Sequence, residues 1–278
     1  IEIDLTEVQL QSGNEPYYSR CNLPQLKLVA HPWGLNHWLS LIEKPFLCKA
    51  EFRSNALQLD AGGGRASLIL GNVGRSERFS LQLRDLTMNS RQGGASGKIS
   101  QLQAHLRKVP GDVMGYDLAL TTEELVLANL SKMDMPIEID AAALEARILG
   151  LVPLKWKMES IDLWRAEGGV LDIQRLWVKW AGVDAKVSGT FALDDLFRPI
   201  GAGTAIVEGY SEILSVLNGA GLIGSGTMFA AALALDLLSS VSEETGQPLV
   251  EVPISIQDGF LNVGPVALME VQALQFFE

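Results

Sequence analysis

Residues 164–210, WRAEGGVLDIQRLWVKWAGVDAKVSGTFALDDLFRPIGAGTAIVEGY, decide the fold that the sequence predicts. The stretch reads as the end of a helix, a Gly-Gly turn and three consecutive strands, because apolar residues recur at every second position. The polar face of the middle strand carries Asp184, Lys186, Ser188 and Thr190. Its opposite face carries Val183, Ala185, Val187, Gly189, Phe191 and Leu193. We therefore expect one face of the sheet to contact something apolar.

The same alternation runs from the start of the chain to about residue 130. Gly-rich breaks at 62–64, 71–74 and 93–97 separate several of these strands, and glycine adopts the positive φ that tight turns need. Because connections this short join antiparallel neighbours, the pattern predicts a long, curved antiparallel β-meander.

Helical periodicity appears in three places on the C-terminal side. It predicts helices from Ser160 to Glu167, from Tyr210 to Asn218 and from Thr227 to Val241. The third is apolar nearly all round, so we expect it to be largely buried. Residues 136–156 are compatible with a short helix or with a strand. Two strands joined by a hairpin turn at Asp258-Gly259 close the chain.

These patterns together predict an α+β fold, in which two or three helices pack on the sheet in the C-terminal half. No Pro- or Ser-rich linker divides the chain. We therefore expect residues 1–278 to form a single β-rich domain. The change of pattern allows a subdivision into a β-meander, residues 1–135, and an α+β half, residues 136–278.

The composition excludes several classes of protein. Hydrophobic residues make up 47% of the 278 residues and charged residues 20%, which is typical of a globular protein. The net charge is −11 and the sequence contains no cluster of basic residues, so nucleic acid is not expected as a partner. Residues 213–235 lack charge over a membrane-spanning length, but Asn218-Gly219 and Gly224-Ser225-Gly226 break them into two short helices.

Two cysteines, Cys21 and Cys48, lie 27 positions apart. In an oxidising compartment a disulfide between them would stabilise the fold by about 3–4 kcal/mol. Two buried thiols are the alternative, since Cys48 shares a strand face with Phe46, Ala50 and Phe52. The spacing leaves both alternatives open.

No group of residues indicates catalysis or a cofactor. The three histidines, His31, His37 and His105, lack metal-ligand spacing, and nucleotide-binding and hydrolase motifs are missing from the sequence. We expect no metal, no cofactor and no enzymatic activity. A hydrolase that uses Asp194 or Asp258 is the weakest of three hypotheses.

The tryptophans are the most suggestive side chains. Trp156, Trp164, Trp177 and Trp180 fall close to the central strands, together with Phe191. Core packing explains such a group, and so does an apolar ligand groove or a partner surface, where tryptophan is favoured. Trp180 shares a face with Leu176 and Val178, whereas Trp177 points the other way unless a bulge intervenes.

Residues of the C-terminal half resemble a known family. They are Trp164 with Gly168-Gly169, Trp180, the run from Gly189 to Asp194, Pro199, Gly201, Gly209-Tyr210, Ala220-Gly221, Asp258-Gly259 and Gly264-Pro265. In these residues the chain resembles the bacterial domain-of-unknown-function family 2125, found mainly in alphaproteobacteria. The resemblance implies a periplasmic envelope protein, held at the inner membrane by an N-terminal segment upstream of Ile1, and it implies no catalytic residue. The strand texture also resembles AsmA-like envelope proteins, at the level of fold alone.

Two functional hypotheses remain. The first is a non-enzymatic envelope protein whose sheet holds a lipid or another apolar ligand in a groove, with the helix near Thr227 to Val241 closing one end. The second is a periplasmic scaffold or assembly factor that binds another envelope protein through a sheet edge or a tryptophan patch. A packed interior without an apolar cavity would count against the first hypothesis.

Overall fold

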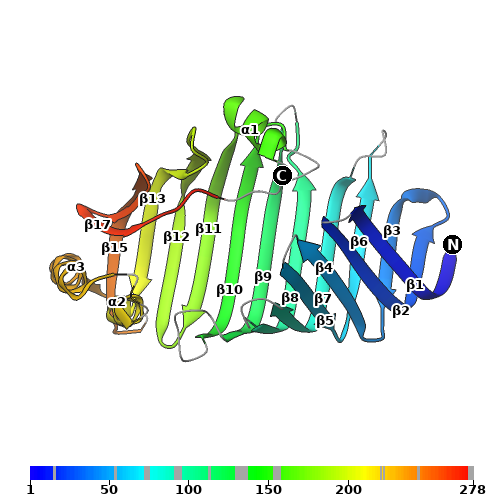
Figure 1. Cartoon of the computed structure of the whole chain (residues 1–278), viewed down its shortest axis with the longest axis horizontal. Helices are drawn as coiled ribbons and strands as arrows, with labels where there is room; N and C mark the ends of the chain where they lie inside the picture. The colour runs from blue at the N-terminus through cyan, green and yellow to red at the C-terminus, as the bar shows by residue number, and fades with distance from the viewer. Residues whose placement is uncertain are drawn as a thin grey trace. The chain divides into compact units, whose positions relative to one another are not determined.

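The computed structural model describes residues 1–14, 17–52, 55–71, 76–90, 96–111, 114–128, 137–152, 158–219, 221, 223–242 and 245–274. Within these residues, 17 strands form one antiparallel sheet and three helices lie in the C-terminal half of the chain (Figure 1). The predicted α+β fold class is confirmed. By its contacts the chain divides into unit 1, residues 1–108 with 119–141, and unit 2, residues 109–118 with 142–278. The prediction of a single domain stays a prediction.

Eight strands belong wholly to unit 1. They are β1 (Glu2–Asn14), β2 (Tyr17–His31), β3 (Gly34–Ile42), β4 (Phe46–Phe52), β5 (Asn55–Ala61), β6 (Gly63–Leu70), β7 (Ser76–Ser90) and β8 (Ser96–Lys108). Two strands contribute residues to both units, β9 (Gly115–Ala128) and β10 (Ile137–Leu149). Of the two alternatives that the sequence leaves open after residue 136, the structure therefore contains the strand.

The remaining elements belong to unit 2. They are α1 (Met158–Ala166), β11 (Val170–Trp180), β12 (Val183–Leu193), β13 (Pro199–Glu208), α2 (Tyr210–Gly219), α3 (Ser225–Leu238), β14 (Ser240–Val241), β15 (Pro248–Gln257), β16 (Phe260–Val263) and β17 (Val266–Glu270). The helices begin and end within a few residues of the predicted limits. The short strands β14 and β17 have no counterpart in the prediction.

Six strands of unit 1 form a closed circuit of antiparallel pairs. The second half of β2 pairs with β3 and its first half pairs with β4. In the same way β7 pairs with β6 and then with β5, while β3 pairs with β6 and β4 with β5. The β4–β5 hairpin is thereby held over β7 (Figure 1). The enclosed core consists of Leu23, Phe46, Ala61, Leu83, Leu86 and Ile99.

The strand β7 changes partners at Asp85, whose φ of 53° lies in the left-handed region. The peptide N–H of Gly62 donates to the carbonyl of Arg84 at 2.9 Å. A Cβ on Gly62 would lie 2.9 Å from Oδ2 of Asp85, which is closer than a side chain tolerates. The predicted Gly-rich break is therefore also the point where two strand pairs meet.

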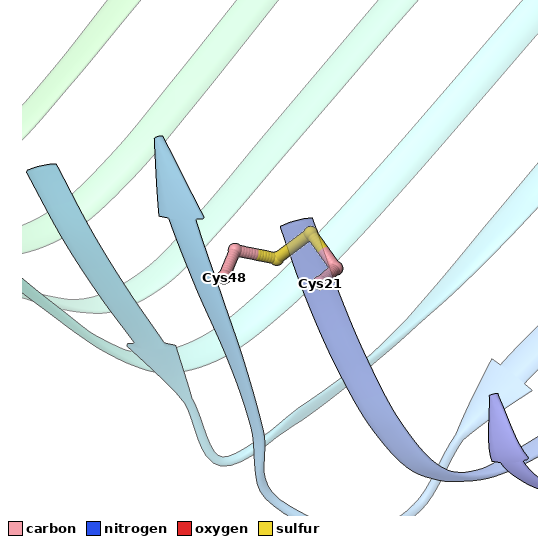
Figure 2. The surroundings of a disulfide bond; sticks show 2 residues. All are labelled: Cys21 and Cys48. Atoms are coloured by element: carbon pink, nitrogen blue, oxygen red, sulfur yellow. A yellow bond between two sulfur atoms is a disulfide. The ribbon is translucent and has the colours of Figure 1, made fainter. Parts of the chain in front are cut away.

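Cys21 and Cys48 form a disulfide, with their sulfur atoms 2.02 Å apart (Figure 2). They are directly paired residues of β2 and β4. Both pack against the core of unit 1. The bond therefore joins two neighbouring strands of the closed circuit.

In unit 2 the strands pair in the order β11, β12, β13, β15, β16 and β17. Paired apolar residues form one continuous face, and a bulge between Ile173 and Leu176 keeps both residues on it. Toward one end of the strands, α2 and α3 cover this face. The core there consists of Ala205, Tyr210, Leu214, Ile223, Ala231, Leu235, Val250 and Val252.

The prediction that the third helix is largely buried is wrong. Only one side of α3 packs on the core, through Ala231 and Leu235. Phe229, Leu233 and Leu237 lie on another side and are 72%, 54% and 80% exposed. Helix α3 carries apolar residues on nearly every side, but other elements pack against only one side of the helix.

Candidate functional site

A cavity of about 350 Å³ lies in unit 2 beneath α1. Strands β9 to β13 contribute residues to its lining, and Val152, α1 and the C-terminal segment contribute the rest. Every lining side chain is apolar. The lining consists of Leu118, Leu144, Ile148, Val152, Ile161, Trp164, Leu171, Phe191, Ala192, Leu193, Pro199 and Leu274.

Trp164 fixes α1 at the edge of the cavity. Its indole Nε1–H donates to the carbonyl of Leu149 at 2.8 Å, which satisfies the only polar group of the side chain. Two glycines make room for the ring. A Cβ on Gly169 would lie 2.2 Å from its Cε2, and a Cβ on Gly150 would lie 3.1 Å from its Nε1. The Gly168-Gly169 turn therefore also provides the space in which the Trp164 ring packs.

Phe191, on β12, also lines the cavity. It is paired with Gly201 of β13, where a Cβ would lie 2.7 Å from Cδ1 of the phenyl ring. The ring thus covers a strand position that has no side chain, and Leu171 is its other cross-strand partner. The alternation of β12 carries Phe191 onto the apolar face, as the sequence predicts.

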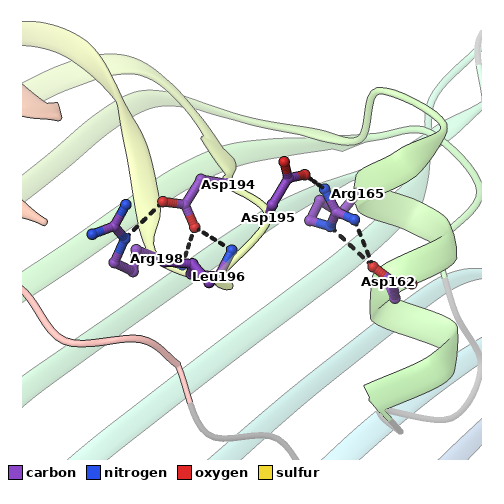
Figure 3. Close-up of polar contacts among 6 residues, drawn as sticks. All are labelled: Asp162, Arg165, Asp194, Asp195, Leu196 and Arg198. Atoms are coloured by element: carbon purple, nitrogen blue, oxygen red, sulfur yellow. Dashed lines mark hydrogen bonds and ion pairs between the residues drawn. The ribbon is translucent and has the colours of Figure 1, made fainter. Parts of the chain in front are cut away.

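Ion pairs attach α1 to the turn between β12 and β13 (Figure 3). Arg165 of α1 binds Asp162 at 2.8 Å within the helix and Asp195 of the turn at 2.5 Å. Its guanidinium carbon also lies 5.8 Å from the centre of the Phe197 ring. Helix α1, which covers the cavity, is therefore held in place by contacts of both Trp164 and Arg165.

Asp194 holds the turn itself. One carboxylate oxygen accepts the peptide N–H groups of Leu196 and Arg198, and the other accepts Nε–H of Arg198 at 2.7 Å (Figure 3). Burial alone would raise the pKa of Asp194, but the hydrogen bonds from Arg198 and Leu196 outweigh it and lower the pKa below its ordinary value. These contacts engage both carboxylate oxygens in the turn, which weakens the case for Asp194 as a catalytic group.

The structure brings together two of the five aromatic residues that the sequence singles out, Trp164 and Phe191. Trp177 and Trp180 do not line the cavity. Trp180 shares the apolar face with Val183, whereas Trp177 lies on the other face and donates Nε1–H to Asp184 at 3.0 Å. Trp156 lies outside the described residues.

Most of the aliphatic lining is missing from the sequence prediction. Leu144 and Ile148 carry a signal, since they alternate along one strand, but nothing in the sequence distinguishes them from ordinary core residues. Leu118 and Leu274 come from distant segments. Leu274 is placed by its peptide N–H, which donates to the carbonyl of Phe197 at 3.0 Å.

In the described part of the chain, no three His, Cys, Asp or Glu side chains gather in a way that suits a metal ion. No helix within the described ranges has the length and apolar character needed to span a membrane. Asp258 lies at the tip of the β15–β16 hairpin with a φ of 54°.

The family comparison covers nearly the whole chain. The model of a family described as an uncharacterized protein conserved in bacteria (DUF2125) matches residues 1–272. Neither the search of curated proteins nor the search of solved structures finds a match. The match includes Trp164, Phe191 and every other residue of the cavity lining except Leu274. The chain therefore belongs to the DUF2125 family of bacterial proteins.

Proposed function

We propose that this protein is a non-enzymatic envelope protein that holds an acyl chain or a similar apolar ligand in the cavity of unit 2. The cavity beneath α1 carries the proposal, because all twelve of its lining residues are apolar. Ligand sites are mostly apolar hollows of roughly 300–1,000 Å³. A volume of about 350 Å³ is at the small end of that range, which favours a single apolar chain over a bulky lipid.

The architecture of the site supports this reading over catalysis. None of the lining side chains carries a titratable group, so the cavity offers neither an acid nor a base to a bound molecule. The element that closes the cavity is α1, whereas the sequence-based hypothesis assigns this position to the helix near Thr227 to Val241. The apolar face of the sheet is the one that the sequence predicts.

The proposed location is the periplasm. The Cys21–Cys48 disulfide supports an oxidising compartment, because such bonds persist there and are rare in the cytosol.

A titration with the uncharged fluorescent probe N-phenyl-1-naphthylamine tests the cavity. We expect the wild-type protein to bind the probe with increased fluorescence. Leu144→Trp fills the cavity and should weaken binding by about tenfold or more, because a packed ligand loses contacts with the lining. Leu163→Trp is the matched control, since Leu163 lies on α1, is 55% exposed and does not line the cavity. Equal binding by all three proteins would contradict the proposal.

A second candidate function is a scaffold that binds another envelope protein. The exposed side of α3 favours it, because Phe229, Leu233 and Leu237 are spaced by four residues and form an apolar stripe. A pull-down from the envelope with the wild-type protein and with Leu233→Lys tests it. Loss of a stoichiometric partner in the variant would support the scaffold, and retention of the partner would exclude this stripe as its binding surface.

A further inference from the structure

A second hollow, of about 520 Å³, lies in unit 1 on the face of the sheet formed by β2, β3, β6, β7 and β8. The strand register aligns its residues in two rows. The first row is Lys27, Leu41, Arg65, Gln82 and Gln103. The second row is Val29, Leu39, Ser67, Ser80 and His105. All ten residues line the hollow.

The hollow is divided between apolar and polar side chains. On β2 and β3 it presents Val29, Leu39 and Leu41, of which the two leucines are 46% and 38% exposed, beside Lys27, which is paired with Glu2. On β6, β7 and β8 it presents serine, glutamine, arginine and histidine side chains. An exposed apolar end next to a polar end is the arrangement that an amphiphile requires.

Arg65 dominates the polar end. Its Nε–H donates to Oε1 of Gln82 at 2.6 Å, which orients the guanidinium group. A guanidinium has five N–H donors, so most of them remain for a ligand. Among the described residues, no carboxylate forms an ion pair with Arg65, whereas Lys27 at the other end is paired with Glu2.

His105 completes the polar end, and His37, which does not line the hollow, bonds to one of its serines. His105 bonds through Nδ1 to Oγ of Ser80, and His37 bonds through Nε2 to Oγ of Ser67, both at 3.0 Å. Ser67 and Ser80 are themselves directly paired across β6 and β7.

The two rows continue onto β1, where Asp4 is paired with Lys27 and Glu2 with Val29, so the charge of Lys27 is balanced. Within the described ranges, the unbalanced positive charge of the hollow lies at Arg65. This local charge is complementary to an anion.

We propose that this hollow binds a single-chain amphiphile with an anionic head group, either a carboxylate or a phosphate. The head group lies at Arg65, Gln103 and His105, where a guanidinium provides charge-assisted hydrogen bonds. The chain lies against Leu39 and Leu41. This site is separate from the cavity beneath α1, since it lies in unit 1 and requires a charge that the cavity does not provide.

Isothermal titration calorimetry tests the proposal with dodecanoate and dodecyl phosphate, each below its micelle concentration. Uncharged dodecyl maltoside and inorganic phosphate are the two ligand controls. We expect at least one dodecyl anion to bind, and Arg65→Gln to weaken its binding by about tenfold or more, because a charge-assisted hydrogen bond is lost. Comparison of the two anions identifies the preferred head group.

Two further variants make the result specific. Lys49→Gln removes one positive charge from an exposed position on β4 outside the hollow, and should change the affinity less than twofold. Leu144→Trp fills the cavity of unit 2 and should leave binding of the dodecyl anion unchanged. The proposal is overturned if neither anion binds, if the maltoside or inorganic phosphate binds equally well, or if Arg65→Gln retains the wild-type affinity.

Discussion

Unit 1 covers the apolar residues of its strands with other strands, whereas unit 2 covers them with helices. In unit 1 the β4–β5 hairpin completes a closed circuit, and Leu86 in the core is only 2% exposed. In unit 2 the apolar face is shared between α1 at one place and the α2–α3 pair at another. The apolar cavity of unit 2 lies beneath α1.

The hydroxyl of Tyr210 links the two helices, α2 and α3, that cover part of the apolar face of unit 2. It donates to Oδ1 of Asp236 at 2.6 Å and so joins α2 to α3. The hydrogen bond to Asp236, together with burial, raises the pKa of Tyr210. The helices of unit 2 are thus joined by side-chain contacts, while the strands of unit 1 are held by continuous backbone ladders.

The largest expected effect is a difference between truncations in the two units. Leu86→Ala should lower the free energy of unfolding by about 2–5 kcal/mol, because it leaves a new void in a closely packed core. Leu144→Ala should cost about half of this or less, because Leu144 already borders an empty space and loses fewer contacts. Urea denaturation of both variants measures the difference. Equal losses would show that the two units are packed alike.

Removal of the disulfide should have the next largest effect. The double variant Cys21→Ala, Cys48→Ala should lose about 3 kcal/mol of stability, because the unfolded chain regains the entropy of a loop of 27 residues. Hydrogen exchange should place the loss in unit 1 and leave unit 2 unchanged. A reducing agent should reproduce the loss in the wild type and have no effect on the variant. If hydrogen exchange increased equally in unit 2, the stabilities of the two units would not be independent.

The smallest expected effect concerns the turn that anchors α1. The pKa of Asp194 is lower in the folded protein, so its carboxylate stabilises the fold above the ordinary value of 3.8 and loses this contribution as the pH falls through the lowered pKa. Asp194→Asn should therefore be less stable than the wild type at pH 7 by at most about 1 kcal/mol. Thermal unfolding between pH 7 and pH 2.5 should show the difference shrinking below about pH 4. A difference independent of pH would contradict this role.

The sequence predicts the strands better than it predicts their arrangement. Alternation identifies β12 and its apolar face, because successive side chains of a strand point to opposite faces of the sheet. The closed circuit of unit 1 is not predictable in this way, since β2 and β7 each change partners midway and alternation is the same for either partner. Residues 137–149 form a strand although their composition also suits a helix, because pairing with neighbouring strands overrides local propensity.

The candidate sites depend even more on long-range pairing. Trp164 and Phe191 are suggested by residue type, but Leu118 and Leu274 join them only through the fold. The polar side chains of the hollow in unit 1 are also brought together only by the fold. Arg65 and His105 are 40 positions apart and the sequence contains no basic cluster, yet the register of β6, β7 and β8 places them in adjacent rows of one hollow.

Native mass spectrometry tests the central claim most directly. The protein is purified without detergent from its own bacterium, and organic extraction with lipid analysis follows. We predict a population whose mass exceeds that of the chain by one apolar ligand, with this excess lost in Leu144→Trp and kept in Leu163→Trp. A clean mass of the chain alone, with no lipid in the extract, would contradict the assignment of the cavity as a ligand site.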